Sequence, residues 1–534
     1  MRLSQLLAFL PEPPLAAPGA VGPDPDITGI AYDGRRVTPG SLFVAVWHRG
    51  YASDGHNYVA QAVRNGAAAV VVSRPVDLPE RVPQVTVPDT AAALGWLGAG
   101  FYGLPSQRLG IVGVTGTDGK TTTCTLTTAV LEAAGFQTGM ATTVASKSTG
   151  AAQANPQHTS TPEAVEIQQL LARTVDEGGA RAVLEATSHA LDQHRLAGCE
   201  LDVAVVTRVT HEHMEYHGTY DAYLAAKARI LDLLQTNTRR PKHVTFHKAA
   251  VLNADDSSFA ALAPLSPALV IPYGLGDRAI VRAVDVQPQA WGTACRVLSP
   301  WGEDHLDLQM PGEFNVYNAL AALASGCTLE APFDVALAAL AAQRGVRGRM
   351  ERVDAGQPFT VVVDFAHTPD SLERVLTLLR GQVAPAGGRV LVVFGSAGER
   401  DVQKRPMMGR VAAQLGDFAV FTDEDPRQED RDTILDDIAA GALAIGGVEG
   451  ETFVRQPDRR KAIVEALSRA RPGDAVLLAG KGHETSIIGQ LDGKLHTFPW
   501  DEHAVALTAL QNLGYRPRST AGEPPLSVPE RGRG

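Results

Sequence analysis

The sequence predicts an α/β protein with parallel sheets, and two observations carry this prediction. Short runs rich in β-branched residues recur along the 534-residue chain, and a segment with helical period follows each of them. These runs end in, or close to, Gly, Asp, Ser or Thr, as strands do before a loop. Strands that alternate with helices at this spacing form βαβ units. The strands are expected at 108–115, 182–187, 203–206, 360–364, 390–395, 419–422 and 475–479.

The composition limits the class of protein. The 48 basic and 59 acidic side chains leave a formal charge of −11, which argues against a general nucleic-acid binder. With 44% hydrophobic and 20% charged residues, the chain has a globular composition and not a disordered or fibrous one. It contains neither a long apolar span nor a signal-peptide pattern, and its four cysteines lack the CxxC spacing. We expect a cytoplasmic monomer that binds neither nucleic acid nor membrane.

The chain is long enough for three or four domains of about 150 residues each. One boundary is expected near Pro105, where a new strand begins, and another near Arg347, after a helical stretch over 315–343. Alternating polarity over 265–311 predicts an antiparallel flank, and the first residues predict an amphipathic helix. The expected domains are 1–105, 106–345 and 346–515, followed by a disordered tail at 516–534.

A glycine-rich turn joins an expected strand to a helix that begins near Lys120. The segment reads LGIVGVTGTDGKTTTCTL. Its backbone N–H groups and the positive end of the helix suit a phosphate chain. Lys120 would reach the outer phosphates, and the hydroxyl of Thr121 or Thr122 would bind Mg²⁺. Val114 stands where the strict motif has glycine, so the loop is a variant. The alternative is a glycine-rich turn beside a surface lysine.

The variant loop TGTDGKTT resembles that of the Mur ligase superfamily, and the resemblance extends from about residue 28 to 515. Those enzymes join an amino acid to a carboxylate with hydrolysis of ATP, and folylpolyglutamate synthases share the loop. The resemblance implies a small αβ uridine-binding domain, a central P-loop ATPase domain and a C-terminal Rossmann-like domain. It also implies ATP and Mg²⁺ as cofactors. The ATP-binding residues it implies are Gly116, Thr117, Asp118, Gly119, Lys120, Thr121, Thr122, Asn315, Asn318, Arg349 and Asp364.

The resemblance also implies a metal site near the ends of the central strands. Glu185 and His213 match Mg²⁺ ligands of the family, together with Thr121. Lys227, on a helix expected to begin near Tyr220, matches a lysine that reacts with CO₂. The resulting carbamate carries a negative charge and two oxygens, so it converts a lysine into a metal ligand.

Other interpretations of these residues remain open from the sequence alone. His211, His213 and His217 would suit zinc, although an HxH pair without a fourth ligand close in sequence is weak evidence. Lys227 by itself would be interpreted as a solvated surface lysine.

The segments GRME and DFAHTPD resemble a family element in which Phe365 takes the place of the usual tyrosine. The resemblance implies that Arg349 contacts the γ-phosphate, and that Asn315 and Asn318 lie near the adenine. From the residues alone, Arg349 equally suits a surface ion pair, and Asn315 a helix N-cap. The catalytic residues implied are Lys120, Lys227 (as the carbamate), Arg349 and His367.

Four further segments resemble the family members that add the third residue of the peptidoglycan stem peptide. QHTSTPEA and TSHALDQHR match elements that hold the muramoyl dipeptide, while VFGSAGERDVQKR, and TDEDPRQED with LLAGKGHET, match elements around the incoming diamino acid. The dipeptide-binding residues implied are Gly34, Ser160, Thr161, Ser188, Gln193 and Arg195. Gly34 stands where the uridine-binding D-S-R element usually has serine. The residues implied around the amino acid are Arg400, Asp425, Arg427, Gly480 and Glu484.

The resemblance implies that the D-Glu carboxylate of UDP-MurNAc-L-Ala-D-Glu is activated as an acyl phosphate and joined to a diamino acid. The acceptor stays open among meso-diaminopimelate, L-ornithine and L-lysine. Arg427 suits a second carboxylate, whereas Asp425, in place of the usual asparagine, suits a bare ammonium. The alternatives are another Mur-type or folylpolyglutamate-type amide ligase, or a non-catalytic paralogue that binds a UDP-peptide.

Overall fold

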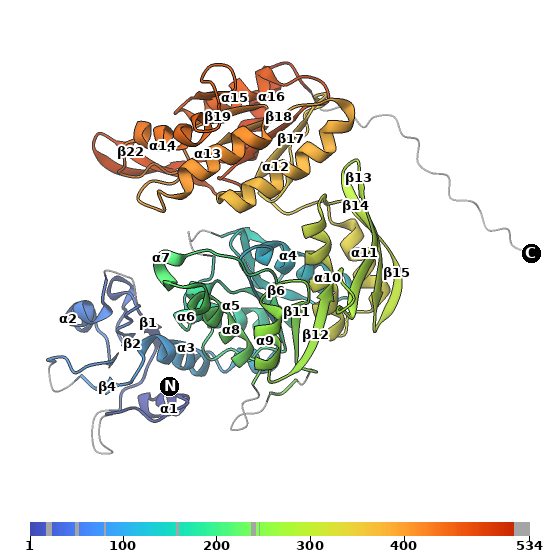
Figure 1. Ribbon diagram of the computed structural model, residues 1–534. Coiled ribbons are helices and arrows are strands. Elements are labelled where there is room, and N and C mark those ends of the chain that lie inside the picture. Colours follow the sequence, from blue (N-terminus) through green and yellow to red (C-terminus); the bar gives the residue numbers. More distant parts are fainter. Residues whose placement is uncertain are drawn as a thin grey trace, which may run out of the picture. The chain divides into compact units, whose positions relative to one another are not determined.

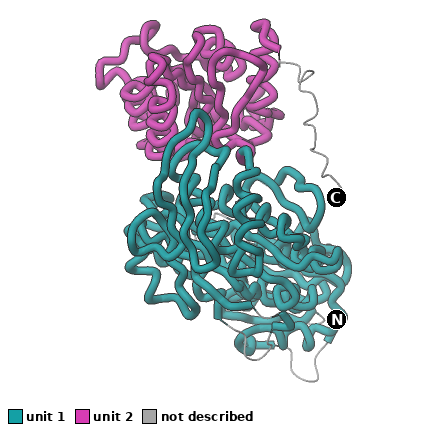
Figure 2. The backbone as a smooth tube through the Cα atoms, turned by 90° about the vertical axis from the view of Figure 1, so that its right-hand side faces the viewer, with its two compact units in different colours: residues 1–344 teal, residues 345–534 magenta. Residues whose placement is uncertain are grey.

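The computed structural model forms two compact units, residues 1–344 and 345–534, which Figure 2 colours separately. Most strands in both units pair in parallel, which confirms the predicted α/β class. The described residues are 1–17, 24–48, 53–78, 82–155, 160–235, 242–244 and 246–516. The tail predicted to be disordered lies outside the described residues from 517 onward. No helix among the described residues is long and apolar enough to cross a bilayer.

A four-stranded parallel sheet opens the first unit. Its order is β1 (Gly29–Ala31), β2 (Ser41–Val44), β3 (Ala69–Val72) and β4 (Gln84–Thr86). The helices beside it are α1 (Leu3–Leu7), α2 (Val59–Arg64) and α3 (Thr90–Phe101). Because side chains alternate along a strand, Leu42 and Val44 of β2 pack with α1 and α3, whereas Phe43 packs with α2. The predicted N-terminal helix is present, but it spans only five residues.

An eleven-stranded sheet forms the centre of the first unit, in the order β15-β14-β13-β12-β11-β10-β5-β9-β6-β7-β8. Its parallel strands are β5 (Gly110–Thr115), β6 (Thr138–Ala141), β9 (Arg181–Glu185), β10 (Val203–Val206), β11 (Ala249–Asn253) and β12 (Leu269–Gly274). Five further strands flank them: β7 (Ala145–Lys147), β8 (Gln153–Ala154), β13 (Val281–Gln289), β14 (Gly292–Ser299) and β15 (Gly302–Leu308). The start of β13 still pairs in parallel with β12, whereas β14 and β15, like β7 and β8, pair antiparallel with their neighbours. The antiparallel flank predicted over 265–311 thus begins later, because β12 pairs in parallel with β11.

Helices cover both faces of this sheet (Figure 1). One face is covered by α4 (Lys120–Ala133), α10 (Glu313–Thr328) and α11 (Phe333–Ala342). The other carries α5 (Ala164–Asp176), α6 (Ser188–Asp192), α8 (Tyr220–Asp232) and α9 (Phe259–Leu262). The helical stretch predicted over 315–343 forms two helices, α10 and α11. Pro332 disfavours helical geometry at the preceding residue, and the second helix begins directly after it.

The second unit holds a six-stranded sheet in the order β16-β17-β21-β18-β19-β20, parallel except at β16. Its strands are β16 (Glu351–Arg352), β17 (Thr360–Asp364), β18 (Val390–Phe394), β19 (Phe418–Phe421), β20 (Phe453–Arg455) and β21 (Ala475–Ala479). Its helices are α12 (Pro369–Val383), α13 (Lys404–Leu415), α14 (Arg431–Leu443), α15 (Arg459–Arg469) and α16 (Glu502–Asn512). A hairpin of β22 (Ser486–Leu491) and β23 (Lys494–Pro499) precedes the last helix.

The register of the central sheet brings three strand ends to one edge. Thr115 of β5 pairs with Val206 of β10, and Val114 pairs with Glu185 of β9. In parallel sheets, ligands bind outside the carboxyl ends of the strands. This edge is therefore where the functional side chains of the first unit are expected.

A buried ion pair ties α15 to α16 in the second unit. The Arg459 guanidinium donates to Glu502 at distances from 2.6 to 3.1 Å, and the Trp500 indole N–H donates to the same carboxylate at 2.6 Å. Arg459 also donates to the backbone carbonyls of Asp423 and Ala479. Both charged side chains are almost fully buried.

We expect Glu502→Ala to lower the free energy of unfolding by about 3–5 kcal/mol, because it leaves a buried guanidinium without its counter-ion. Denaturant unfolding of the full chain, followed by tryptophan fluorescence, would measure the loss. The matched control is Glu465→Ala on α15, whose more exposed pair with Arg469 should contribute about 0.5 kcal/mol or less. Equal losses in the two variants would contradict this assignment.

Candidate active site

The predicted phosphate loop connects β5 to α4, and two of its glycines are required by their surroundings. Gly116 and Gly119 have φ angles of +147° and +83°, in the left-handed region that favours glycine. A Cβ on Gly116 would lie 1.9 Å from Oγ1 of Thr207, and one on Gly119 would lie 2.4 Å from Oδ1 of Asn318. The prediction of a helix from Lys120 is confirmed.

Lys120 lies directly over this loop. Its Nζ donates to the carbonyl oxygens of Gly116 at 3.1 Å and Thr117 at 2.7 Å. The loop is held from the other side, since Thr117 N–H donates to the carbonyl of Arg208 and the Thr207 hydroxyl donates to that of Asp118. The ammonium group therefore lies among loop carbonyls, at the positive end of α4.

The structure brings together Thr121 and Glu185, two of the predicted metal ligands. The Thr121 hydroxyl donates to Oε2 of Glu185 at 2.9 Å. Thr143 donates to the same carboxylate through its hydroxyl at 2.8 Å and through its N–H at 2.9 Å. Hydroxyl and carboxylate oxygens are the donors that Mg²⁺ prefers, so the set fits this ion. Sequence reasoning missed Thr143.

Lys227 is fully buried, so the interpretation of it as a surface lysine is wrong. Its Nζ donates to the carbonyl of Gly116 at 2.6 Å and lies 4.4 Å from the centre of the Tyr223 ring. Burial, together with the nearby charge of Lys120, holds the pKa of Lys227 well below its usual value. A neutral amine is thus available at a lower pH than on an exposed lysine.

Tyr223 is a second residue that sequence reasoning missed. It is fully buried on α8, one helical turn before Lys227. Its hydroxyl donates to Glu212 at 3.2 Å and lies 2.9 Å from the Thr117 hydroxyl. The i, i+4 spacing of an aromatic residue and the lysine was the available signal, because that spacing places both on one helix face.

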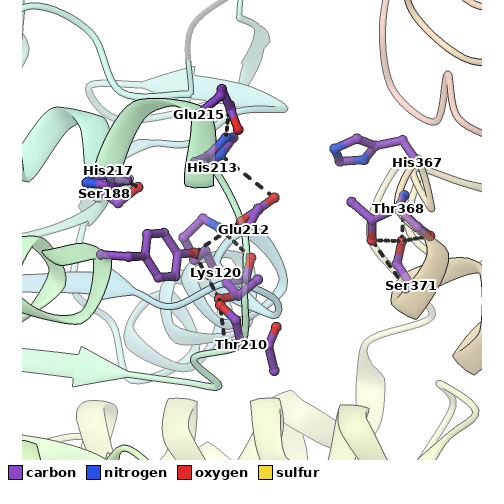
Figure 3. A network of polar contacts seen from close by, with 12 residues as sticks. Lys120, Ser188, Thr210, Glu212, His213, Glu215, His217, His367, Thr368 and Ser371 are labelled. Carbon is purple, nitrogen blue, oxygen red and sulfur yellow. Dashed lines mark hydrogen bonds and ion pairs between the residues drawn. The ribbon is translucent and has the colours of Figure 1, made fainter. Parts of the chain in front are cut away.

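The three histidines considered for zinc have different partners. His213, which precedes α7 (Met214–His217), lies between Glu212 and Glu215 (Figure 3) and packs edge-on against His189 at 4.7 Å. The His211 ring lies against Tyr220, and His217 Nε2 lies 3.1 Å from the Ser188 hydroxyl. Over the described part of the chain, no group of three His, Cys, Asp or Glu side chains is placed to hold a metal ion.

Four residues predicted to bind the dipeptide form a network beside β9. Arg195 donates to the carbonyl of Thr161 at 2.7 Å and to Oε1 of Gln193 at 2.8 Å. Gln193 donates to Tyr216 of α7, and Ser188 contacts His217 of the same helix, α7. The Thr161 hydroxyl donates to the backbone carbonyl of Glu185. This network of predicted dipeptide-binding residues therefore adjoins Glu185, a predicted metal ligand.

The two remaining dipeptide-binding predictions have fewer contacts. Ser160 is half-buried next to Thr161. Gly34 begins the 3₁₀ turn Gly34–Arg36, and its carbonyl accepts a hydrogen bond from Asn65 at 2.8 Å.

The two asparagines predicted near the adenine connect α10 to α4. Asn315 is three residues past Gly312, which precedes the helix, so the N-cap interpretation of Asn315 is wrong. Its side chain donates to the carbonyl of Pro311 and accepts from Asn318 at 3.3 Å. Asn318 in turn accepts from the Thr123 hydroxyl on α4. These contacts place Asn318 against Gly119 of the phosphate loop.

In the second unit, Asp364 and its neighbours shape the end of β17. The Asp364 carboxylate accepts from the N–H groups of Met350 and Ala366 at 2.7 and 2.8 Å. The Arg349 guanidinium lies 4.5 Å from the Phe365 ring, so it has a cation–π partner. His367 Nδ1 lies 2.8 Å from the carbonyl of Phe365, just before the Thr368–Ser371 cap of α12 (Figure 3).

Two of the residues predicted around the amino acid, Asp425 and Glu484, pair with a buried lysine that the sequence reasoning missed. Lys481 lies 2.9 Å from Asp425 and 2.6 Å from Glu484. Burial alone would lower the pKa of Lys481, but the carboxylates of Glu484, Asp425 and Glu424 hold it above its usual value. Asp425 is therefore already paired with an internal ammonium. The sequence did contain a signal for Lys481, because it lies directly after Gly480 in the GKGHE segment.

Four further residues belong to this region. Burial raises the pKa of Glu424, and Oε2 of this residue has no hydrogen-bond partner among the described residues. Arg427 has a φ angle of +56°, and its N–H donates to Ile488 at 3.0 Å. The N–H of Gly480 donates to the carbonyl of Asp364, whereas Arg400 is exposed after β18.

Comparison with known proteins places these features in a family. The models of the Mur ligase family catalytic domain, the Mur ligase middle domain and the Mur ligase glutamate ligase domain match residues 26–102, 114–326 and 348–482. The UDP-N-acetylmuramyl-tripeptide synthetase of Roseiflexus sp. (strain RS-1) is 48% identical over 521 residues, or 96% of this chain and 100% of that protein.

Two further comparisons agree. The UDP-N-acetylmuramoyl-L-alanyl-D-glutamate–2,6-diaminopimelate ligase of Bacillus velezensis is 39% identical over 516 residues, covering 96% of this chain and 99% of that one. A solved structure of a ligase with the same name has a TM-score of 0.62 at 27% identity, and covers 91% of this chain and 95% of that one. The chain belongs to the Mur ligase family.

Proposed function

We propose that this protein is an ATP-dependent ligase of peptidoglycan precursor synthesis, acting as a cytoplasmic monomer. It joins a diamino acid to the D-Glu carboxylate of UDP-MurNAc-L-Ala-D-Glu. The observation that carries the proposal is the convergence at one sheet edge of the phosphate loop, the Glu185 carboxylate and the buried amine of Lys227. The Thr161–Arg195 network adjoins the same edge. The names of the relatives supply the identity of the substrates.

The reaction has two steps. The D-Glu carboxylate attacks the γ-phosphorus of ATP, which releases ADP and forms an acyl phosphate. The neutral amine of the diamino acid then attacks the acyl carbon to form a tetrahedral intermediate, the nitrogen gives up a proton, and the C–O bond to phosphate breaks as phosphate leaves. The loop N–H groups, Lys120 and the N-terminal end of α4 hold the phosphates and offset their charge.

Four groups of this chain would hold Mg²⁺: the Thr121 hydroxyl, the Glu185 carboxylate, the His213 imidazole and Lys227 as its carbamate. The bound ion supplies charge neutralisation where the carboxylate approaches the phosphates. The Thr121 and Glu185 oxygens already lie within hydrogen-bond distance of each other, which supports their shared role.

Two features support a carbamate on Lys227. First, CO₂ reacts with a neutral amine, and burial lowers the pKa of Lys227 in the required direction. Second, a carbamate nitrogen keeps one N–H, so it would still donate to the Gly116 carbonyl that Nζ now contacts at 2.6 Å. The modification therefore preserves the hydrogen bond that orients the side chain.

The charges around Lys481 bear on the choice of acceptor. One ammonium faces two carboxylates, Asp425 and Glu484, so this trio carries a formal charge of −1. An asparagine in place of Asp425 would bring it to zero. The negative trio favours a distal ammonium on the substrate, whereas Arg427 favours a second carboxylate. An assay with each amino acid in turn would decide whether the acceptor carries a bare distal ammonium or a second carboxylate.

The first test is phosphate release by the purified protein with ATP, Mg²⁺ and UDP-MurNAc-L-Ala-D-Glu. Diaminopimelate, ornithine and lysine are supplied in separate reactions. We expect release that requires both the dipeptide substrate and one amino acid, because the acyl phosphate turns over only when an amine takes it.

The control reactions omit either the UDP-linked substrate or the amino acid. A folded protein that binds ATP but is silent with all three acceptors would contradict the proposal. Release with a folate and glutamate would favour the folylpolyglutamate alternative. Binding of the UDP-peptide without turnover would favour the non-catalytic one.

A second test addresses Lys227 directly. We expect ¹³C-bicarbonate to give a carbamate signal by NMR at pH 7–8, which is lost in Lys227→Met. Because the neutral amine predominates above its pKa, and burial holds the pKa of Lys227 well below its usual value, the signal should persist at neutral pH and fade only on acidification. Activity should fall several-fold in CO₂-depleted buffer and return with bicarbonate. An unlabelled, fully active enzyme would rule out the carbamate.

A third test concerns Asp425. We expect Asp425→Asn to raise the ratio of kcat/KM for diaminopimelate to that for ornithine by about tenfold, because it removes one negative charge that repels a second carboxylate. Asp492→Asn, on the exposed turn of the β22–β23 hairpin, is the charge-matched control and should leave the ratio unchanged. An unchanged ratio in Asp425→Asn would show that Asp425 does not influence acceptor choice.

A further inference from the structure

We propose that Glu163 and Glu166, at the start of α5, are positioning residues that set the spacing between the two halves of the UDP-peptide site. We call them the α5 carboxylate pair. The inference deepens the proposed function and rests on it, because it concerns how one ligand is held at both ends.

Glu166 contacts the turn proposed to bind the nucleotide. Its Oε1 accepts from the Tyr32 hydroxyl at 3.0 Å and from Nη1 of Arg36 at 3.2 Å. These two residues lie on either side of Gly34. The contacts span 130 or more residues of sequence, so they join the N-terminal sheet region to the central sheet region within the first unit.

Glu163 contacts Arg195, one of the residues proposed to bind the peptide, and lies near His48. Its Oε1 lies 3.1 Å from Nη2 of Arg195, and its Oε2 lies 3.7 Å from Nε2 of His48. Burial by itself raises the pKa of Glu163, but the nearby His48 imidazole and the charge of Arg195 bring it below its usual value. Arg195 donates at the same time to the carbonyl of Thr161.

The two carboxylates are also joined to each other. The N–H of Glu163 donates to Oε2 of Glu166 at 3.2 Å in the capping box of α5. A rigid helix end thus holds Arg36 and Tyr32 on one carboxylate and Arg195 on the other. Both carboxylates are largely buried, and each has a cationic partner.

A ligand that occupies two linked sites binds tightly only when their spacing matches its own length. UDP-MurNAc-L-Ala-D-Glu has a nucleotide at one end and a peptide at the other. The α5 carboxylate pair would therefore strengthen binding of the whole ligand without strengthening binding of its nucleotide part. This difference separates a positioning role from a general structural one.

The experiment compares wild type, Glu166→Gln and Tyr32→Phe. We expect the KM for UDP-MurNAc-L-Ala-D-Glu to rise about tenfold in Glu166→Gln and less in Tyr32→Phe, which loses one hydroxyl. The Kd for UDP alone by calorimetry, the kcat and the KM for ATP should stay within about twofold. Glu177→Gln is the matched control, because Glu177 is a hydrogen-bonded carboxylate at the other end of α5.

An equal weakening of UDP and of the full ligand would overturn the inference, since Glu166 would then shape the nucleotide site alone. Unchanged constants for both ligands would overturn it as well. Wild-type protein that fails to bind the full ligand would instead contradict the proposed function. In that case, amide hydrogen exchange of residues 29–36 still tests the pair. Faster exchange in Glu166→Gln than in Glu177→Gln supports it, and equal exchange overturns it.

Discussion

The carbonyl oxygen of Gly116 accepts hydrogen bonds from two lysines, and the rest of the central site depends on this shared acceptor. Lys120 approaches it from the start of α4, and Lys227 approaches from α8. Gly116 has a φ angle of +147°, in the left-handed region that favours glycine. One peptide group thereby links the phosphate loop to the lysine proposed as a metal ligand. The closeness of the two charges also disfavours protonation of Lys227.

Partner groups within the chain determine what its charged side chains can do. Glu185 accepts hydrogen bonds from Thr121 and Thr143, so its carboxylate is oriented before any ligand arrives. In the second unit, Lys481 lies between Asp425 and Glu484. Because both carboxylates pair with the same ammonium, the net charge of the three groups matters more than the charge of either carboxylate. The balance of such a cluster, more than any single residue, would decide which amino acid is accepted.

The start of α5 shows how a helix end can connect two sheets. Its two carboxylates neutralise Arg36 and Arg195, which come from segments far apart in the sequence. The Arg195–Glu163 pair is shielded from water on both sides, so it is weakened less by salt than the Arg36–Glu166 pair, whose guanidinium is 66% exposed. In the proposed role of the α5 carboxylate pair, a long substrate would benefit because its two ends would meet sites whose separation is already set.

The sequence by itself determined the α/β class, the strand-to-helix position of the phosphate loop and the strands near 110, 182, 203 and 360, because glycine spacing and hydrophobic runs are local signals. Those signals do not report what surrounds a side chain. Only the tertiary structure decided that Lys227 is buried, that Asn315 lies inside its helix and that Asp425 is paired with Lys481. It also revealed Tyr223, Thr143 and Glu163 as partners of predicted residues. Burial and ion pairing arise from segments that meet only on folding. The sequence therefore does not distinguish a lysine that hydrogen-bonds to water from one that is buried and donates to a backbone carbonyl.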